Sequence, residues 1–200
     1  NWTATIGPKI ENYYMYAAPV SIYRPGFHKA FKLGSLSGAF GASTKTGVGI
    51  KYVGDNGFAA STNVVSSSSG TAGFLTNEDE YKWDTMLAYT QDQYHVSLTL
   101  SQQHDDWTSF QYYATTAAGT VDDDSNATAY AARAYWRPQE SGTATPEISV
   151  GYDVINFDGQ AGSGKVTEAS SYFVGLGWPD MFSDGDYVGV GFGQPLKATE

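Results

Sequence analysis

Residues 93–101 read Gln93-Tyr94-His95-Val96-Ser97-Leu98-Thr99-Leu100-Ser101, and polar and apolar side chains alternate at every position. Successive side chains of a β-strand point to opposite faces of a sheet, so this stretch predicts a strand with two unlike faces. The apolar face holds Tyr94, Val96, Leu98 and Leu100, and the polar face holds His95, Ser97, Thr99 and Ser101. Soluble sandwiches and membrane barrels both contain such strands, and they differ in which face meets water.

The same alternation recurs along the chain and defines the remaining strands. We predict strands over residues 2–10, 47–53, 58–65, 81–91, 127–137, 147–153, 171–178 and 188–193, with a further candidate at 110–116. The stretch at 54–57, Gly-Asp-Asn-Gly, predicts a hairpin turn. Residues 11–25 contain two prolines and clustered tyrosines, so they predict a long irregular loop, with one helical turn at 27–31 after it. The chain is therefore expected to be all-β, with eight to ten strands.

The composition excludes several classes of protein. Charged residues make up 16% of the chain, against about 25% in typical soluble domains, while aromatic residues make up 15%. The chain has no cysteine, which excludes a disulfide framework and cysteine-based zinc sites. No apolar run reaches the roughly 18 residues that a membrane-spanning helix needs. The net charge of −10 argues against nucleic acid as a partner.

The distribution of charged and aromatic residues favours a membrane barrel over a sandwich. The polar faces carry mostly Ser, Thr, Gly and Asn, and the charges concentrate in the expected loops. A soluble sandwich usually carries charge on its outer face, whereas a barrel faces lipid with its apolar side and places aromatic rings near the strand ends. The aromatic residues that fit this placement are Tyr81, Tyr89, Tyr94, Tyr130, Trp136, Tyr152, Tyr172 and Trp178. The alternative is a soluble β-sandwich that buries these rings and binds carbohydrate through exposed Tyr and Trp.

The C-terminal third resembles a known family. Residues 172–182 read Tyr-Phe-Val-Gly-Leu-Gly-Trp-Pro-Asp-Met-Phe, and residues 188–195 read Val-Gly-Val-Gly-Phe-Gly-Gln-Pro, with Gly185 between them. This pattern resembles the outer-membrane porins of the OprB type, especially their cyanobacterial branch. Those proteins have a strand, a Pro-Asp-Leu-Phe-like turn, a glycine and a strand ending near Gly-x-x-Pro, and Met181 stands here where Leu is usual. Residues 7–10, Gly-Pro-Lys-Ile, resemble the Gly-Pro-Arg segment of the cyanobacterial members.

The resemblance implies a transmembrane antiparallel β-barrel of sixteen strands that forms a homotrimer in the outer membrane. It implies passive diffusion of small hydrophilic solutes or inorganic ions, iron included, without covalent chemistry or a cofactor. Such barrels need roughly twice as many residues as the 200 of this chain, and they usually end on an aromatic strand. We therefore expect residues 1–200 to be an internal part of a longer barrel, without a tether domain or the last strands. A narrower barrel of eight to ten strands is the alternative.

The basic N-terminal third is the best functional lead. Residues 1–54 carry six basic residues against one acidic residue, whereas residues 55–200 carry five against twenty. A loop that folds into a pore and carries bases opposite acids would narrow the pore and set its selectivity. The candidates for pore lining or constriction are Arg24, Lys29, Lys32, His95, Arg133, Arg137 and Asp153. The alternatives are an external solvated loop for the first three and contact with lipid headgroups for the strand-end arginines.

Two loop motifs contain residue types that catalysis or metal binding uses, and we expect both to be solvated loops. His104-Asp105-Asp106 would suit a hydrolase that activates water, but no second dyad accompanies it. The run Asp122-Asp123-Asp124-Ser125-Asn126 offers oxygen ligands for Ca²⁺ without the spacing of an EF-hand. We therefore expect no enzyme activity and no metal site. The expected partners are outer-membrane lipid and small solutes or ions.

Overall fold

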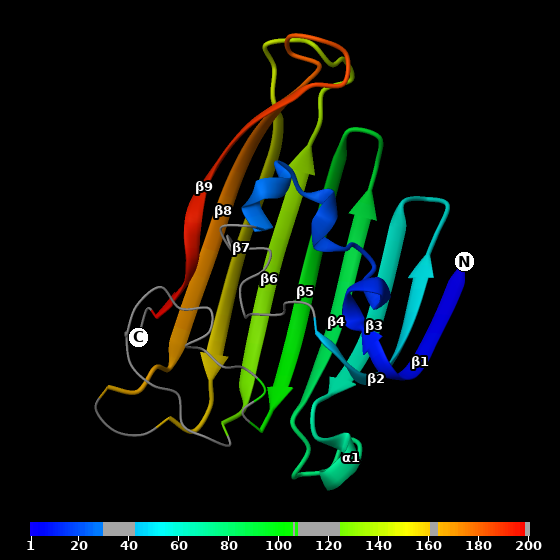
Figure 1. The fold of residues 1–200 in the computed structure, drawn as a ribbon, viewed down its shortest axis with the longest axis vertical. Helices are drawn as coiled ribbons and strands as arrows, with labels where there is room; N and C mark the ends of the chain where they lie inside the picture. The colour runs from blue at the N-terminus through cyan, green and yellow to red at the C-terminus, as the bar shows by residue number, and fades with distance from the viewer. Residues whose placement is uncertain (30–42, 106, 108–124, 161–163, 199–200) are drawn as a thin grey trace.

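The computed structural model describes residues 1–29, 43–105, 107, 125–160 and 164–198. Nine strands form one antiparallel sheet in which each strand pairs with its neighbours in the chain (Figure 1). The strands are β1 (Trp2–Glu11), β2 (Thr44–Val53), β3 (Phe58–Ser66), β4 (Tyr81–Thr90), β5 (Tyr94–His104), β6 (Ala127–Trp136), β7 (Glu147–Phe157), β8 (Glu168–Pro179) and β9 (Tyr187–Ala198). The sheet is open, with β1 and β9 as its edges. The predicted all-β class is confirmed, and the described strands form one sheet rather than the two of a sandwich.

The predicted strands are confirmed, but β7, β8 and β9 are longer than predicted. Strand β7 runs to Phe157, β8 begins at Glu168 and β9 continues to Ala198. In these extensions most side chains on the otherwise polar face are apolar, among them Ile155, Phe157, Ala169 and Leu196, so the two faces differ little in the sequence. These four side chains belong to a buried cluster that also contains Ala127 and Ala129 of β6 and Val166, which precedes β8. The candidate strand at 110–116 lies outside the described residues.

The connections at one end of the sheet are on the whole shorter than those at the other, although residues 137–146 and 158–167, at opposite ends, are equal in length. At the upper end in Figure 1 the strands are joined by residues 54–57, 91–93, 137–146 and 180–186. The other four pairs of consecutive strands have their linked ends at the lower end in Figure 1, where residues 12–43, 67–80, 105–126 and 158–167 leave and rejoin the sheet, and residues 67–80 hold the short helix α1 (Ser69–Ala72). The predicted turn at 54–57 is confirmed: Gly57 has a φ of 87°, and the Gly54 amide donates to the Phe58 carbonyl at 2.8 Å.

Residues 12–29, here called the inner segment, lie across one face of the sheet (Figure 1). They form three 3-10 turns, η1 (Asn12–Met15), η2 (Val20–Ile22) and η3 (Gly26–Lys29). The irregular loop predicted for 11–25 is confirmed, and the predicted helical turn is the 3-10 turn η3, since residues 30 and 31 lie outside the described residues. None of the helices in the described parts of the chain has the length and hydrophobicity needed to cross a membrane.

The two faces of the sheet are buried in the reverse of the usual order. On β5, Leu98 is 57% exposed, whereas His95 on the opposite face is 2% exposed. Soluble proteins bury their apolar side chains and expose their polar ones. Here the apolar outer face is open, and the polar inner face lies beneath the inner segment, whose own apolar side chains pack on it. That core contains Tyr16, Ala18, Val20, Ala59, Met86, Ala88 and Ala131.

Candidate functional site

The outer face offers a continuous apolar surface. In the described strands β2 to β7, no outward-facing position holds Lys, Arg, Asp or Glu. The exposed side chains at the centre of this face are large and apolar, and they include Val48, Ile50, Leu87, Val96, Leu98, Val150, Val190 and Phe192. An exposed apolar surface of this extent marks a place where a lipid or protein partner binds.

Aromatic side chains form two rows on the outer face. The turn-side row, near the short connections, consists of Trp2, Tyr52, Phe58, Tyr89, Tyr94, Trp136 and Trp178. Neighbouring rings contact one another, with centroids 4.9 Å apart for Trp2 and Tyr52 and 6.2 Å apart for Tyr89 and Tyr94. The loop-side row, near the long connections, consists of Trp83, Tyr130, Tyr152 and Tyr172. The rows enclose the apolar centre of the sheet.

The spacing between the two rows is constant. The pairs Trp83 and Tyr89 on β4, Tyr130 and Trp136 on β6, and Tyr172 and Trp178 on β8 are each six residues apart. At about 3.3 Å per residue, this spacing corresponds to roughly 20 Å along each strand. On these three strands the apolar band between the two rows therefore has the same width.

The aromatic rows run obliquely to the line of residues that pair from strand to strand. The ladder leads from Tyr52 on β2 across to Tyr172 on β8 through Ala60, Leu87, Leu98, Ala132 and Tyr152. The turn-side row starts at Tyr52 but reaches Trp178, six residues beyond Tyr172, after six strand-to-strand steps. The row thus shifts by one residue, or about 3.3 Å, along the strand for each step of about 4.8 Å between neighbouring strands. This ratio corresponds to strands tilted by about 35° from the normal to the row.

Two buried ion pairs occupy the centre of the inner face. Arg133 Nη2 lies 2.7 and 2.6 Å from the two carboxylate oxygens of Asp153, and Lys82 Nζ lies 3.4 Å from Asp84 Oδ2. All four side chains are at most 2% exposed. Because each buried charge has a partner of opposite sign, the two pairs add no net charge to the inner face. The inner face of the sheet is called the wall below.

The inner segment is hydrogen-bonded to this wall through its tyrosines. Tyr16 donates to Asp84 Oδ2 at 2.6 Å, and Asn12 Nδ2 donates to the same oxygen at 3.3 Å. Burial and then the Asp84 carboxylate hold the pKa of Tyr16 well above its usual range. The Tyr23 hydroxyl lies 2.7 Å from Ser97 Oγ, and burial raises the pKa of Tyr23 to about 12.

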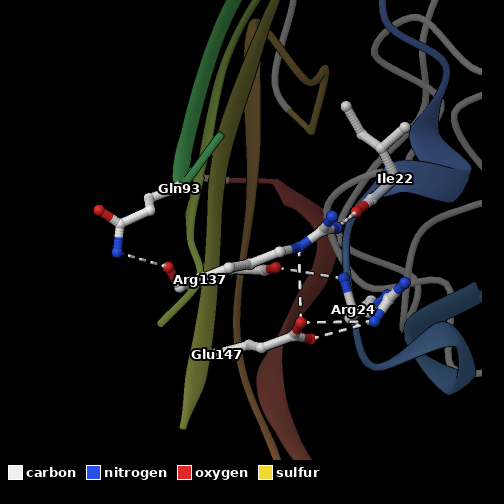
Figure 2. A network of polar contacts seen from close by, with 6 residues as sticks. Ile22, Arg24, Gln93, Arg137 and Glu147 are labelled. Carbon is white, nitrogen blue, oxygen red and sulfur yellow. Dashed lines mark hydrogen bonds and ion pairs between the residues drawn. The ribbon is translucent and has the colours of Figure 1, made fainter. Parts of the chain in front are cut away.

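A second polar cluster joins the inner segment to the wall near the short connections (Figure 2). Arg24 Nη1 lies 3.4 Å from both carboxylate oxygens of Glu147, and Arg137 Nε lies 3.7 Å from one of them. Arg137 Nη2 donates to the Ile22 carbonyl at 2.6 Å, and its guanidinium lies 3.9 Å from the centre of the Tyr135 ring. The side chain of Glu147 is 9% exposed, whereas those of Arg24 and Arg137 are 46% and 26% exposed. These three residues are called the Glu147 cluster below.

The structure brings four of the predicted pore-lining residues to the inner face beneath the inner segment or beside it. Arg133 and Asp153 form the buried pair, Arg137 belongs to the Glu147 cluster, and His95 lies under Tyr23 with ring centroids 5.7 Å apart. His95 Nδ1 also bonds the Thr90 hydroxyl at 2.7 Å. Solvent therefore reaches Arg137 but not the other three.

Of the three basic residues predicted to line the pore from the N-terminal loop, the structure describes the side chain of one. Arg24 belongs to the inner segment and to the Glu147 cluster, so it lies against the wall rather than on an external loop. Lys29 ends η3, and its side chain lies outside the described part of the structure, as does the whole of Lys32. Reasoning from the sequence missed Glu147. The signal was present, because Glu147 opens the polar side of the alternation that continues to Asp153.

The two loop motifs contribute no chemistry among the described residues. A ring nitrogen of His104 bonds the Asp79 backbone carbonyl at 3.0 Å, and the ring stacks on Tyr81 with centroids 4.8 Å apart. Asp106 and residues 122–124 lie outside the described residues. Among the residues that the structure describes, no group of three or more His, Asp or Glu side chains is arranged to hold a metal ion.

Comparison of the chain with known proteins identified no relative: no family model, no curated protein and no solved structure matches it. The functional argument therefore depends on the geometry of the sheet and its inner segment.

Proposed function

We propose that this chain forms part of the wall of an outer-membrane porin, in which small hydrophilic solutes or inorganic ions diffuse passively through a water-filled barrel. The observation that carries this proposal is the reversed burial of the sheet, with an exposed apolar face and a covered polar face. In a transmembrane barrel, lipid contacts the apolar side chains and water contacts the polar ones. In a soluble protein this uncharged, apolar outer face would be in contact with water, which is unfavourable.

The geometry of the outer face supports a bilayer as the apolar layer. The strands are 9 to 12 residues long, close to the 9–11 or so that a tilted transmembrane strand needs. The tilt of about 35° falls at the lower end of the range for outer-membrane barrels. Aromatic rows on both sides of an apolar band are the pattern of rings that lie at the two membrane interfaces.

The lengths of the connections indicate which end of the sheet would face the periplasm. Outer-membrane barrels have short turns on the periplasmic side and longer loops outside. We therefore assign residues 54–57 and 91–93 to the periplasmic side and residues 67–80 to the outside. The residues that resemble OprB-type porins form β8, the turn after it and β9, which are one hairpin in the structure. In this proposal, further strands pair with β1 and β9 to close a barrel of about sixteen strands, and three barrels form a homotrimer.

The proposed mechanism is diffusion without covalent chemistry. The inner segment lies against the wall from β3 to β7, so it narrows the lumen on that side. Its contacts include the Ala17 amide with Ser61 Oγ at 2.8 Å and the Arg24 amide with Ser149 Oγ at 3.1 Å. Selectivity then depends on the radius that remains and on the charges at the surface of the segment and wall.

Reconstitution of the full-length protein in a planar lipid bilayer tests the proposal. We expect stepwise increases in conductance from samples that are folded, as judged by a mobility change on heating in detergent. A folded sample that produces no steps would contradict the porin proposal. A chain that remains monomeric in buffer without detergent would favour the soluble carbohydrate-binding alternative, since an apolar outer face of this extent requires lipid or detergent.

A further inference from the structure

We propose that the Glu147 cluster is a binding site for small inorganic anions and gives the pore a preference for anions over cations. This inference rests on the proposed porin function and names the class of solute. It is unexpected from composition, because the whole chain carries a net charge of −10.

The first argument is which charges a solute can reach. In the Glu147 cluster the two guanidiniums are 46% and 26% exposed, while the carboxylate between them is 9% exposed. The cluster carries two positive charges against one negative charge, and the negative charge is the covered one. A solute that passes the cluster therefore meets mainly guanidinium N–H donors.

The second argument is that the other inner-face charges of the described chain offset one another or add to the positive sign. Lys82 with Asp84 and Arg133 with Asp153 are buried neutral pairs. Lys51, which also faces inward, donates to the Tyr14 carbonyl at 3.0 Å, and this neutral acceptor adds no negative charge. The acidic residues that account for the negative total lie mainly in connections between strands, including Asp55, Glu78, Glu80, Asp92, Glu140, Asp158, Asp184 and Asp186.

The third argument is that the guanidiniums are held in place before a solute arrives. Arg137 is fixed by the Ile22 carbonyl, to which its guanidinium donates (Figure 2), and by the Tyr135 ring. Its backbone amide also donates to the Gln93 carbonyl at 2.7 Å. Arg24 is fixed through its own amide to Ser149 Oγ. A planar guanidinium presents several N–H donors in a rigid fork, which suits oxyanions and halides, and anchoring reduces the entropy lost on binding.

The test measures the reversal potential of the reconstituted full-length protein under a gradient of KCl. We expect the wild-type pore to be more permeable to Cl⁻ than to K⁺. Arg24→Gln should lower the ratio of Cl⁻ to K⁺ permeability by about twofold, because it removes the most exposed charge of the cluster. Glu147→Gln should raise the ratio, because it removes the charge that offsets the arginines. Arg24→Lys keeps the charge and should keep the ratio near the wild-type value.

Lys197→Gln is the matched control, since it removes one positive charge from an exposed position at the end of β9, away from the cluster, and should leave the ratio unchanged. Addition of inorganic phosphate should reduce the Cl⁻ current of the wild type more than that of Arg24→Gln. The inference is overturned if the wild type prefers K⁺, if Arg24→Gln and Glu147→Gln do not shift the ratio in opposite directions, or if phosphate leaves the current unchanged. These outcomes need conducting channels, so they differ from the absence of conductance that would contradict the porin proposal itself.

Discussion

The described inner face buries its central charges as ion pairs, so each pair is sensitive to the loss of one partner. Arg133 and Asp153 lie on neighbouring strands and are both essentially inaccessible to solvent. Removal of one member of a buried pair leaves an unpaired charge in a medium of low dielectric constant, whereas removal of both does not.

Replacement of Arg133 by Met should therefore destabilise the protein strongly, because Asp153 remains buried without its partner. We expect a loss of about 3–5 kcal/mol in the free energy of unfolding, measured by urea titration in detergent micelles. The double variant Arg133→Met/Asp153→Leu should recover most of this loss. Equal losses in the single and double variants would contradict the assigned pairing.

Tyr23 should make the stability of the protein fall at alkaline pH. Its pKa is about 12 in the folded protein and about 10 in the unfolded chain. The contribution is therefore fully present below pH 10 and is lost as the pH rises towards 12, at about 1.4 kcal/mol per pH unit. In Tyr23→Phe the decrease in unfolding free energy per pH unit should be smaller by that amount. Titrations at several pH values between 10 and 12 measure the difference, and parallel curves for both proteins would contradict it.

At the scale of single residues, the sequence predicts sides but not contacts. Alternation correctly placed His95, Arg133 and Asp153 on the inner face. It could not reveal that Arg24 meets Glu147, since these residues are far apart in the chain and come together only because the inner segment folds back over the sheet. A contact of this kind depends on the path of an irregular segment, which has no periodicity to read.

At the scale of the strand, the outer face makes a prediction that depends on depth. Leu98 lies near the centre of the apolar band, and Gln102 lies at its loop-side border on the same strand. Leu98→Arg should destabilise the folded protein in lipid by about 2–4 kcal/mol, whereas Gln102→Arg should cost about 0–1 kcal/mol. Equilibrium unfolding in lipid vesicles gives both values. Equal effects at the two positions would indicate that the outer face meets water instead.

Strand positions follow from the sequence wherever the two faces differ in polarity. Strands β4, β5 and β6 have a clear alternation and were predicted to within a few residues. The lower parts of β7, β8 and β9 were missed because residues such as Ile155 and Leu196 are apolar on the inner face as well. There the packing of one strand against its neighbours, rather than a period of two, determines where the ladder ends.

At the scale of the whole molecule, the proposed orientation predicts where the tryptophans lie. Four of the five tryptophans, Trp2, Trp83, Trp136 and Trp178, belong to the aromatic rows on the outer face, and the fifth, Trp107, lies beside Lys82. Lipids brominated near the headgroup should therefore quench the fluorescence of the reconstituted protein more than lipids brominated deep in the acyl chain. Vesicles of unbrominated lipid provide the control. Fluorescence that is insensitive to bromine at either depth would contradict contact between this face and lipid.

The climb of the aromatic rows also limits the radius of any closed cylinder built from these strands. With strands about 4.8 Å apart and tilted by about 35°, nine strands would close at a backbone radius of roughly 8–9 Å, and sixteen would close at about 15 Å. Side chains of the wall project several ångströms inwards, so the smaller cylinder has no room for a further stretch of backbone. In the proposed barrel, the inner segment with its three 3-10 turns therefore fits within the circumference of sixteen strands and not within that of nine. The strand tilt derived from the outer tyrosines and tryptophans, together with the number of strands, thus sets the space available to the inner segment.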